Sequence, residues 1–297
     1  MQKIIKTLFA LVIVLGLAVS CSSPEPPKQD QDQDQEQAQE NEPQDSDASD
    51  EPQDQDKIKV GTTSGADEQI LEKVKEVAAK NGLIVEIVPF SDYVRPNLAL
   101  ADKDVDLNSF QHVPYLETFC KERNLDLVSI GTTYVSPIGF FSKKIQTLDD
   151  LQEGDNLAVP NDPTNGGRAL LLLQKAGFIT VDPEVGLLAT PHDITENNLG
   201  LKIIEVDAAQ TPRTMDDVAA AAINNTFAIP AGLNPATDAI YLEDADSPYV
   251  NVIAARAEDK DNPLYKKFVQ AYQSQEVADF ILSEFKGSTL PAFSYRK

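Results

Sequence analysis

The segment Asn161–Arg168 combines residue types that can bind an anion. It reads Asn-Asp-Pro-Thr-Asn-Gly-Gly-Arg and runs directly into an apolar stretch, which predicts a helix over 166–177. This places Arg168 in the first helical turn, where a cation is disfavoured because the helix N-terminus carries partial positive charge and unsatisfied N–H groups. A bound anion would resolve the conflict.

The neighbouring residues fit such a role. Asn165 or Thr164 can cap the helix, and Gly166 and Gly167 allow a ligand to approach the backbone closely. Arg168 can grip a carboxylate or phosphate with two parallel hydrogen bonds. An Arg168 that faces solvent or pairs with a distant Asp is the alternative, so the motif nominates a site without proving it.

A second group of candidate residues lies within Asn108–Tyr115, where a strand is expected to end and a helix to begin. In open α/β sheets, ligands bind at the carboxyl ends of the strands. Phe110, His112 and Tyr115 are spaced closely enough to wall a pocket there, and Tyr93 arrives from the preceding turn. On spacing alone, these rings could equally be ordinary core or surface residues.

Strand-like and helical patterns alternate along the body of the chain, which predicts a parallel α/β sheet. In the first half, strands are expected at 57–61, 83–90, 105–110 and 125–131, and helices at 66–80, 93–101 and 113–124. In the second half, strands are expected at 156–160, 201–206 and 221–227, and helices at 166–177 and 214–220. A last strand at 250–256 precedes helices at 263–272 and 275–285.

The length of the body favours two lobes over one. We expect the terminal strand and helices to return to the first lobe, so that residues 57–136 plus 250–297 form lobe 1 and residues 137–249 form lobe 2. This arrangement would leave a ligand cleft between the lobes.

The first twenty residues have the pattern of a secretory signal peptide, with Lys3 and Lys6 preceding the apolar run Leu8–Val19. The ending Leu17-Ala-Val-Ser-Cys21 resembles a bacterial lipoprotein signal, which predicts lipid attachment at Cys21. An uncleaved membrane anchor is disfavoured, because a spanning helix needs about 20 apolar residues.

Residues 21–56 follow as an acidic tether. Thirteen acidic residues lie in this segment against Lys28 alone, and it has no aromatic residue, so it is predicted to be disordered. The net charge of the whole chain is −23, which argues against nucleic-acid binding because that function requires a basic face.

Few residues are available for metal binding or cysteine chemistry. The chain has two cysteines and two histidines and no Cys/His cluster, so neither a zinc site nor a cofactor is expected. With Cys21 acylated, Cys120 has no partner for a disulfide. A buried apolar thiol is the preferred interpretation of Cys120.

Five motifs together resemble the methionine-binding lipoproteins of bacterial ABC importers, the MetQ/NlpA family. They are Phe90–Leu100, Phe110–Leu116, Val159–Leu173, Gly186–Pro191 and Ser247–Ile253, and they occur in the family's order between about residue 57 and Phe293. The loop Thr62–Asp67 departs from the Gly-Pro-His type that is common in that family.

The resemblance implies a type II periplasmic-binding-protein fold, with two α/β lobes that close on one amino acid. It assigns the aromatic box to Tyr93, Phe110, His112 and Tyr115, and the carboxylate-binding cation to Arg168. It further assigns Asn224 and Asn251 to the polar ends of the ligand, with Asn165 as a further candidate.

The implied function is capture of methionine or a close analogue and delivery to the permease and ATPase subunits of an ABC importer. The protein would be a monomer and would not be an enzyme. A lipid would anchor it to the extracytoplasmic face of the cell membrane. Two alternatives stay open: an enzyme on the same fold with His112 as general base, and a surface adhesin-type lipoprotein. The residues do not distinguish D-methionine, L-methionine, a sulfoxide or a methionyl dipeptide.

Overall fold

The computed structural model describes residues 56–244 and 247–294. The predicted signal peptide, the lipid-attachment residue Cys21 and nearly all of the acidic tether fall in residues 1–55, outside the described ranges. Within those ranges, no helix combines the length and the apolar character that crossing a membrane requires.

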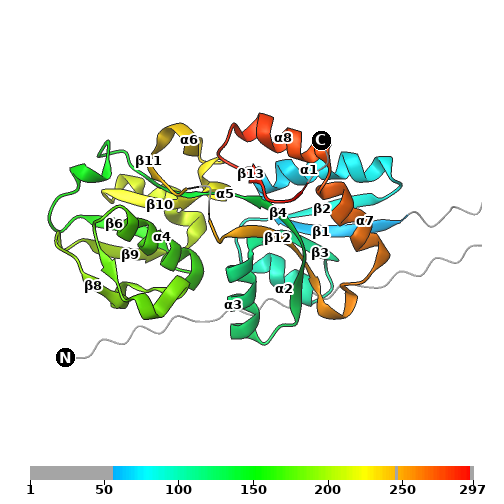
Figure 1. The fold of residues 1–297 in the computed structure, drawn as a ribbon, viewed down its shortest axis with the longest axis horizontal. Coiled ribbons are helices and arrows are strands. Elements are labelled where there is room, and N and C mark those ends of the chain that lie inside the picture. Colours follow the sequence, from blue (N-terminus) through cyan, green and yellow to red (C-terminus); the bar gives the residue numbers. More distant parts are fainter. Residues whose placement is uncertain (1–55, 245–246, 295–297) are drawn as a thin grey trace, which may run out of the picture. The chain divides into compact units, whose positions relative to one another are not determined.

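Two main sheets form the body, and they lie side by side in Figure 1. The six-stranded sheet has the spatial order β13 (Leu290–Pro291), β4 (Leu127–Val135), β12 (Val250–Arg256), β3 (Leu107–His112), β1 (Lys57–Thr63), β2 (Ile84–Phe90). The five-stranded sheet has the order β11 (Ala239–Leu242), β5 (Ile138–Phe141), β10 (Ala220–Asn224), β6 (Asn156–Pro160), β9 (Lys202–Val206). A small two-stranded sheet pairs β7 (Thr180–Val181) with β8 (Ile194–Glu196).

Both main sheets are mixed, so the predicted parallel pairing holds for only part of each sheet. Strand β1 runs parallel to β2 and β3, whereas β12 lies antiparallel between β3 and β4. In the other sheet, β6 is parallel to β9 and β10, and β5 is antiparallel to β10 and β11. The antiparallel strands arise because the chain passes from one sheet to the other and back without a crossover helix.

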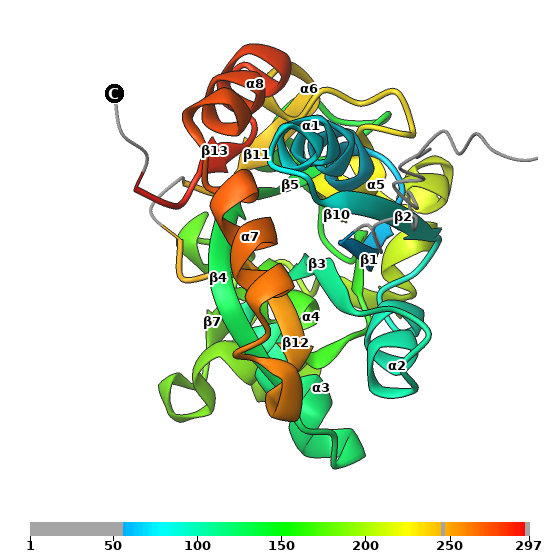
Figure 2. The ribbon, with the colours of Figure 1, turned by 90° about the vertical axis from the view of Figure 1, so that its right-hand side faces the viewer.

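Helices cover both faces of the six-stranded sheet. Over one face lie α1 (Ala66–Lys80), α7 (Pro263–Tyr272) and α8 (Gln275–Phe285), which share one apolar core with β1 (Figure 2). On the opposite face, α2 (Arg95–Ala101) and α3 (Val113–Arg123) pack on a second core through Leu100 and Leu116. Helix α1 has the bounds predicted from its apolar stripe, since its buried residues recur at helical spacing.

The five-stranded sheet is covered in the same way. Helix α4 (Pro163–Lys175) packs on one face, and the 3₁₀ segment η4 (Ala208–Asp216) packs on the other. Short helices α5 (Asn225–Ala228) and α6 (Pro235–Asp238) follow β10. The remaining 3₁₀ turns are η1 (Leu148–Asp150), η2 (Pro183–Leu188), η3 (Pro191–Asp193) and η5 (Ala257–Asp259).

Two predicted helices differ from the structure. The helix expected at 214–220 is the 3₁₀ segment η4, which has Pro212 in its interior and ends before strand β10 begins. The helix expected at 166–177 begins earlier, at Pro163, because Asp162 caps it. Arg168 therefore lies in the second turn of α4, where the conflict with the helix N-terminus is weaker.

The chain passes between the two main sheets at two places. Residues 136–137 lead from β4 to β5, and residues 243–249, which include the undescribed pair 245–246, lead from β11 to β12. These two connections carry Ser136, Glu243 and Tyr249, which take part in the contacts described next.

Candidate functional site

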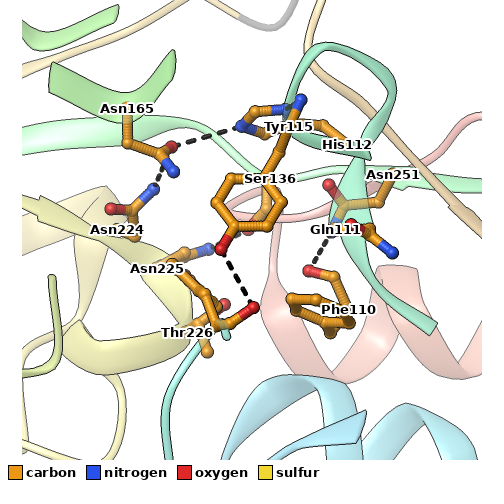
Figure 3. Close-up of a pocket in the computed structure, with 11 residues that line it drawn as sticks. Phe110, Gln111, His112, Tyr115, Ser136, Asn165, Asn224, Asn225, Thr226 and Asn251 are labelled. Atoms are coloured by element: carbon orange, nitrogen blue, oxygen red, sulfur yellow. Dashed lines mark hydrogen bonds between the residues drawn. The ribbon is translucent and has the colours of Figure 1, made fainter. Parts of the chain in front are cut away.

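A cavity is lined by residues from both main sheets and the segments that follow their strands (Figure 3). Its walls are formed by Tyr93, Phe110, Gln111, His112, Tyr115, Ser136, Asn165, Asn224, Asn225, Thr226 and Asn251. Seven of these residues were predicted from the sequence as ligand contacts: Tyr93, Phe110, His112, Tyr115, Asn165, Asn224 and Asn251.

Three aromatic rings form one wall of the cavity. The ring centroids of Tyr93 and Phe110 are 5.8 Å apart, those of Tyr93 and Tyr115 are 5.9 Å apart, and those of Phe110 and Tyr115 are 6.1 Å apart. Phe227 of α5 adds a ring 4.8 Å from Tyr93, from the side of the five-stranded sheet. The hydroxyl of Tyr115 donates to the backbone carbonyl of Tyr93, at 2.9 Å, and so holds the two segments together.

The junction of β3 and α3 explains how neighbouring residues reach one wall. His112 ends the strand and caps the helix, because its Nδ1 accepts from the backbone N–H of Tyr115 at 3.1 Å. Pro114 in the first turn suits this start, since its fixed φ is compatible with a helix and its missing N–H is not needed there. The chain direction changes within three residues, so Phe110 and Tyr115 both face the cavity.

Neutral amide side chains supply much of the rest of the lining. Asn165 Oδ1 accepts from Asn224 Nδ2 at 2.8 Å and lies 3.2 Å from His112 Nε2. Asn251 donates to the backbone carbonyl of Phe110 at 3.3 Å. The buried Oδ1 atoms of Asn224 and Asn225 have no hydrogen-bond partner within the described residues.

Arg168 is not among the residues that line the cavity. Its guanidinium is 3% exposed and pairs with the carboxylate of Glu243, with Nε 3.0 and 3.1 Å from the two oxygens. Nη2 donates both to Glu243 and, at 2.9 Å, to the carbonyl of Ser136, while the ring of Tyr249 lies 4.3 Å from the guanidinium carbon. Arg168 therefore pairs with an acidic residue far away in sequence, which is Glu243 and not the Asp named in the alternative interpretation.

His112 is held as a neutral ring. Burial and the nearby Arg168 charge lower the pKa of His112 to about 3. Because the N–H of Tyr115 occupies Nδ1, the single proton lies on Nε2, facing Asn165. Both ring nitrogens are therefore used in fixing neighbouring groups.

Four lining residues were missed by the sequence analysis: Gln111, Ser136, Asn225 and Thr226. Gln111 and Asn225 are direct neighbours of predicted residues, so their adjacency to Phe110 and Asn224 was the available signal. Ser136 and Thr226 are small residues of ordinary sequence context, and only the folding of their segments against the cavity identifies them.

Cys120 is a free, partly exposed thiol, and it lies outside the cavity lining. Burial raises the pKa of this thiol above its ordinary value, which disfavours the reactive thiolate. In the described ranges, no group of three or more His, Cys, Asp or Glu side chains could hold a metal ion.

Comparisons with known proteins agree with these features. The family model described as NlpA lipoprotein matches residues 58–293. A D-methionine-binding lipoprotein MetQ from Salmonella typhimurium is 53% identical over 236 residues, which cover 78% of this chain and 87% of the relative.

Two solved structures are also similar to this chain in fold and sequence. A nutrient-binding protein from Burkholderia cenocepacia bound to methionine is 53% identical, with a TM-score of 0.78 over 80% of this chain and 100% of that chain. A periplasmic substrate-binding protein of an ABC transporter from Coxiella burnetii is 47% identical, with a TM-score of 0.77 over 79% of this chain and 100% of that chain. The type II periplasmic-binding-protein fold and the resemblance inferred from the five motifs are thereby confirmed. The chain belongs to the NlpA lipoprotein family.

Proposed function

We propose that this protein captures methionine, as the D- or L-enantiomer, outside the cytoplasmic membrane and delivers it to an ABC importer. The observation that carries the proposal is one cavity lined both by a cluster of three aromatic rings and by several neutral amides. The names of its relatives, a D-methionine-binding lipoprotein and a methionine-bound nutrient-binding protein, support it.

The rings suit the thioether of methionine. Contacts between sulfur and an aromatic ring contribute about 0.3 to 1.5 kcal/mol each, beyond the burial of apolar surface. Tyr93, Phe110 and Tyr115 would supply several such contacts, which an aliphatic side chain such as that of leucine cannot match.

The amides suit the ammonium group. The unpartnered Oδ1 atoms of Asn224 and Asn225 are buried acceptors, and such atoms are costly to leave unbonded. An ammonium group can donate to both. Neutral acceptors also leave no unpaired buried charge when the ligand departs.

Binding of the ligand carboxylate by Arg168 remains part of the proposal. Within the described residues, Nε and Nη2 of Arg168 are engaged and Nη1 has no hydrogen bond, so Nη1 is the donor available to a ligand. The Arg168 side chain bonds to the backbone carbonyl of Ser136, which does line the cavity. A ligand carboxylate near Ser136 would then reach Nη1 after a small movement of the arginine.

We further propose that two lobes, residues 57–136 plus 250–297 and residues 137–249, close around the ligand by bending at the two connections that carry Ser136 and Glu243. The importer partners are a permease and an ATPase. The protein acts as a monomer attached to the extracytoplasmic face through a lipid on Cys21.

The enzyme alternative is weaker, because His112 has both ring nitrogens engaged and a pKa far below neutrality. Cys120 is separate from the cavity and is not activated. The adhesin alternative depends on the acidic tether, which lies outside the described residues.

Isothermal titration calorimetry of the mature protein tests the proposal. D-methionine, L-methionine, methionine sulfoxide and a methionyl dipeptide would be compared with leucine and norleucine, and mass spectrometry would identify ligand carried through purification. Tight, stoichiometric binding of a methionine compound without turnover is expected. Equal affinity for leucine, or no binding of any methionine compound, would contradict the proposal.

A further inference from the structure

Helix α5 follows directly after β10 of the five-stranded sheet, and Figure 1 shows it where the two main sheets meet. Its first residue, Asn225, donates through Nδ2 to Ser136 Oγ at 2.8 Å and to the carbonyl of Ser288 at 2.7 Å. Its second residue, Thr226, donates to the buried carboxylate of Asp67 at 3.3 Å. Asp67 belongs to α1 and Ser288 precedes β13, so both residues tie α5 to the half that contains the six-stranded sheet.

The α5 segment also approaches the turn before α1 closely. A Cβ atom at Gly65 would lie 2.7 Å from Cγ of Pro230 and 3.0 Å from the carbonyl oxygen of Thr226. Since these distances leave no space for a side chain, the approach requires glycine at this position. The two halves are therefore packed against each other at α5, in addition to being joined by hydrogen bonds.

Phe227, the third residue of α5, extends this contact to the aromatic lining of the cavity. Its side chain packs against an apolar core of the five-stranded sheet, and its ring centroid is 4.8 Å from that of Tyr93. This is shorter than the 5.8 and 5.9 Å that separate the Tyr93 ring from those of Phe110 and Tyr115. Phe227 is not among the residues that line the cavity, so it reaches the lining through Tyr93.

The local backbone does not by itself fix the ring of Tyr93. Residues 91–94 form neither helix nor strand. The hydroxyl of Tyr115 holds the backbone carbonyl of Tyr93, but this bond does not restrict rotation of the Tyr93 side chain. Phe110, Tyr115 and Phe227 surround the ring, and of these three only Phe227 comes from the half with the five-stranded sheet.

We infer that Phe227 is a positioning residue: from the five-stranded half, it holds the Tyr93 ring in the aromatic lining of the cavity. Paired aromatic rings attract each other beyond the burial of their apolar surface, which gives this contact its strength. The aromatic lining is then complete only while α5 stays docked on α1. The consequence for methionine binding rests on the proposed function.

A double-mutant cycle measured by calorimetry tests the inference. Phe227→Leu keeps an apolar side chain against the core but removes the ring, and it is expected to weaken methionine binding about 5-fold. In a chain that already carries Tyr93→Leu, the same substitution should cause no further loss, because Phe227 acts through the Tyr93 ring. Equal losses in both backgrounds would overturn the inference, as would unchanged affinity in the single variant.

Phe178→Leu is the matched control. Phe178 is also partly buried and packs against a different core of the five-stranded sheet, and it does not line the cavity. Its substitution should leave the affinity for methionine unchanged. A loss as large as that in Phe227→Leu would attribute the effect to general loosening of this half and would contradict a specific role of Phe227.

NMR spectroscopy without ligand separates this inference from the proposed function. With isotope-labelled aromatic rings, nuclear Overhauser effects between Tyr93 and Phe110 should be present in the wild type and in Phe178→Leu, and should be weaker in Phe227→Leu. If they are unchanged in Phe227→Leu, Phe227 does not position Tyr93, whatever ligand the wild type binds. If they weaken although wild-type protein binds no methionine, the proposed function fails and the positioning role of Phe227 stands.

Discussion

The guanidinium of Arg168 is neutralised within the protein by the carboxylate of Glu243. The two residues are 75 positions apart, and both are largely shielded from solvent. Arg168 belongs to α4, whereas Glu243 begins the connection from the five-stranded to the six-stranded sheet. With the carbonyl of Ser136 as a second acceptor, one side chain ties α4 to both connections between the sheets.

Replacing Arg168 by Ala is expected to lower the free energy of unfolding by about 3 kcal/mol or more, because it leaves a shielded carboxylate without its partner. Urea denaturation measures this effect. The double variant Arg168→Met with Glu243→Leu should regain most of the lost stability, since no unpaired charge remains. Equal destabilisation in the single and double variants would show that the ion pair is not the cause.

Phe110→Leu should reduce the preference for methionine over norleucine. The substitution keeps an apolar side chain but removes one ring from the wall, and with it a sulfur–aromatic contact of about 0.3 to 1.5 kcal/mol. Calorimetry with both amino acids measures the ratio of affinities, and Phe119→Leu, outside the lining, serves as the control. A ratio that is unchanged in Phe110→Leu would mean that this ring does not contact the sulfur.

Titration of His112 should not alter the affinity for methionine between pH 5 and 8. Its pKa is about 3 because of burial and the Arg168 charge, so the ring stays neutral throughout this range. NMR can follow the two histidines of the chain individually. A His112 midpoint near the ordinary value of about 6.5 would contradict the prediction.

Asp67 should make the protein less stable as pH rises. Its carboxylate is buried and accepts hydrogen bonds from the hydroxyls of Thr63 and Tyr134 and, at 3.3 Å, from Thr226. Burial outweighs these bonds and raises the pKa of Asp67 to about 6. The unfolded chain therefore releases this proton near pH 4, while the folded protein keeps it until about pH 6.

The stabilising contribution of Asp67 is present below the unfolded pKa and is lost as pH rises through the folded pKa. The other titratable groups that face Asp67 are phenols with raised pKa values, so they remain neutral in this window: Tyr93, Tyr134 and Tyr272. Relative to the wild type, Asp67→Asn should gain on the order of 3 kcal/mol between pH 4 and 7, since two pKa units correspond to about that energy. Denaturation at several pH values measures it, with the exposed Asp261→Asn as control; parallel curves for wild type and Asp67→Asn would refute it.

The aromatic wall was accessible from the sequence because its members are close along the chain. Phe110, His112 and Tyr115 lie at one strand–helix junction, where local geometry brings them together. The start of α4 was misplaced for a local reason as well. Asp162 and Pro163 form a standard cap and first turn, whereas the sequence analysis assigned the cap to Asn165 or Thr164.

Long-range partners could not be predicted. Nothing in the sequence near Arg168 indicates Glu243, and the pairing follows only from the return of the chain through residues 243–249. Strand β5 was not predicted, because its four residues form a short apolar run without alternation. The antiparallel character of β12 likewise depends on which strands it reaches and not on its own residues.

The position of β12 also bears on biosynthesis. This strand is translated near the end of the chain, yet it lies between β3 and β4 in the interior of the six-stranded sheet. The native hydrogen bonds that join β3 to β4 through β12 cannot form until this strand has emerged from the ribosome. A nascent chain that stops short of Val250 therefore leaves β3 and β4 without the strand that joins them.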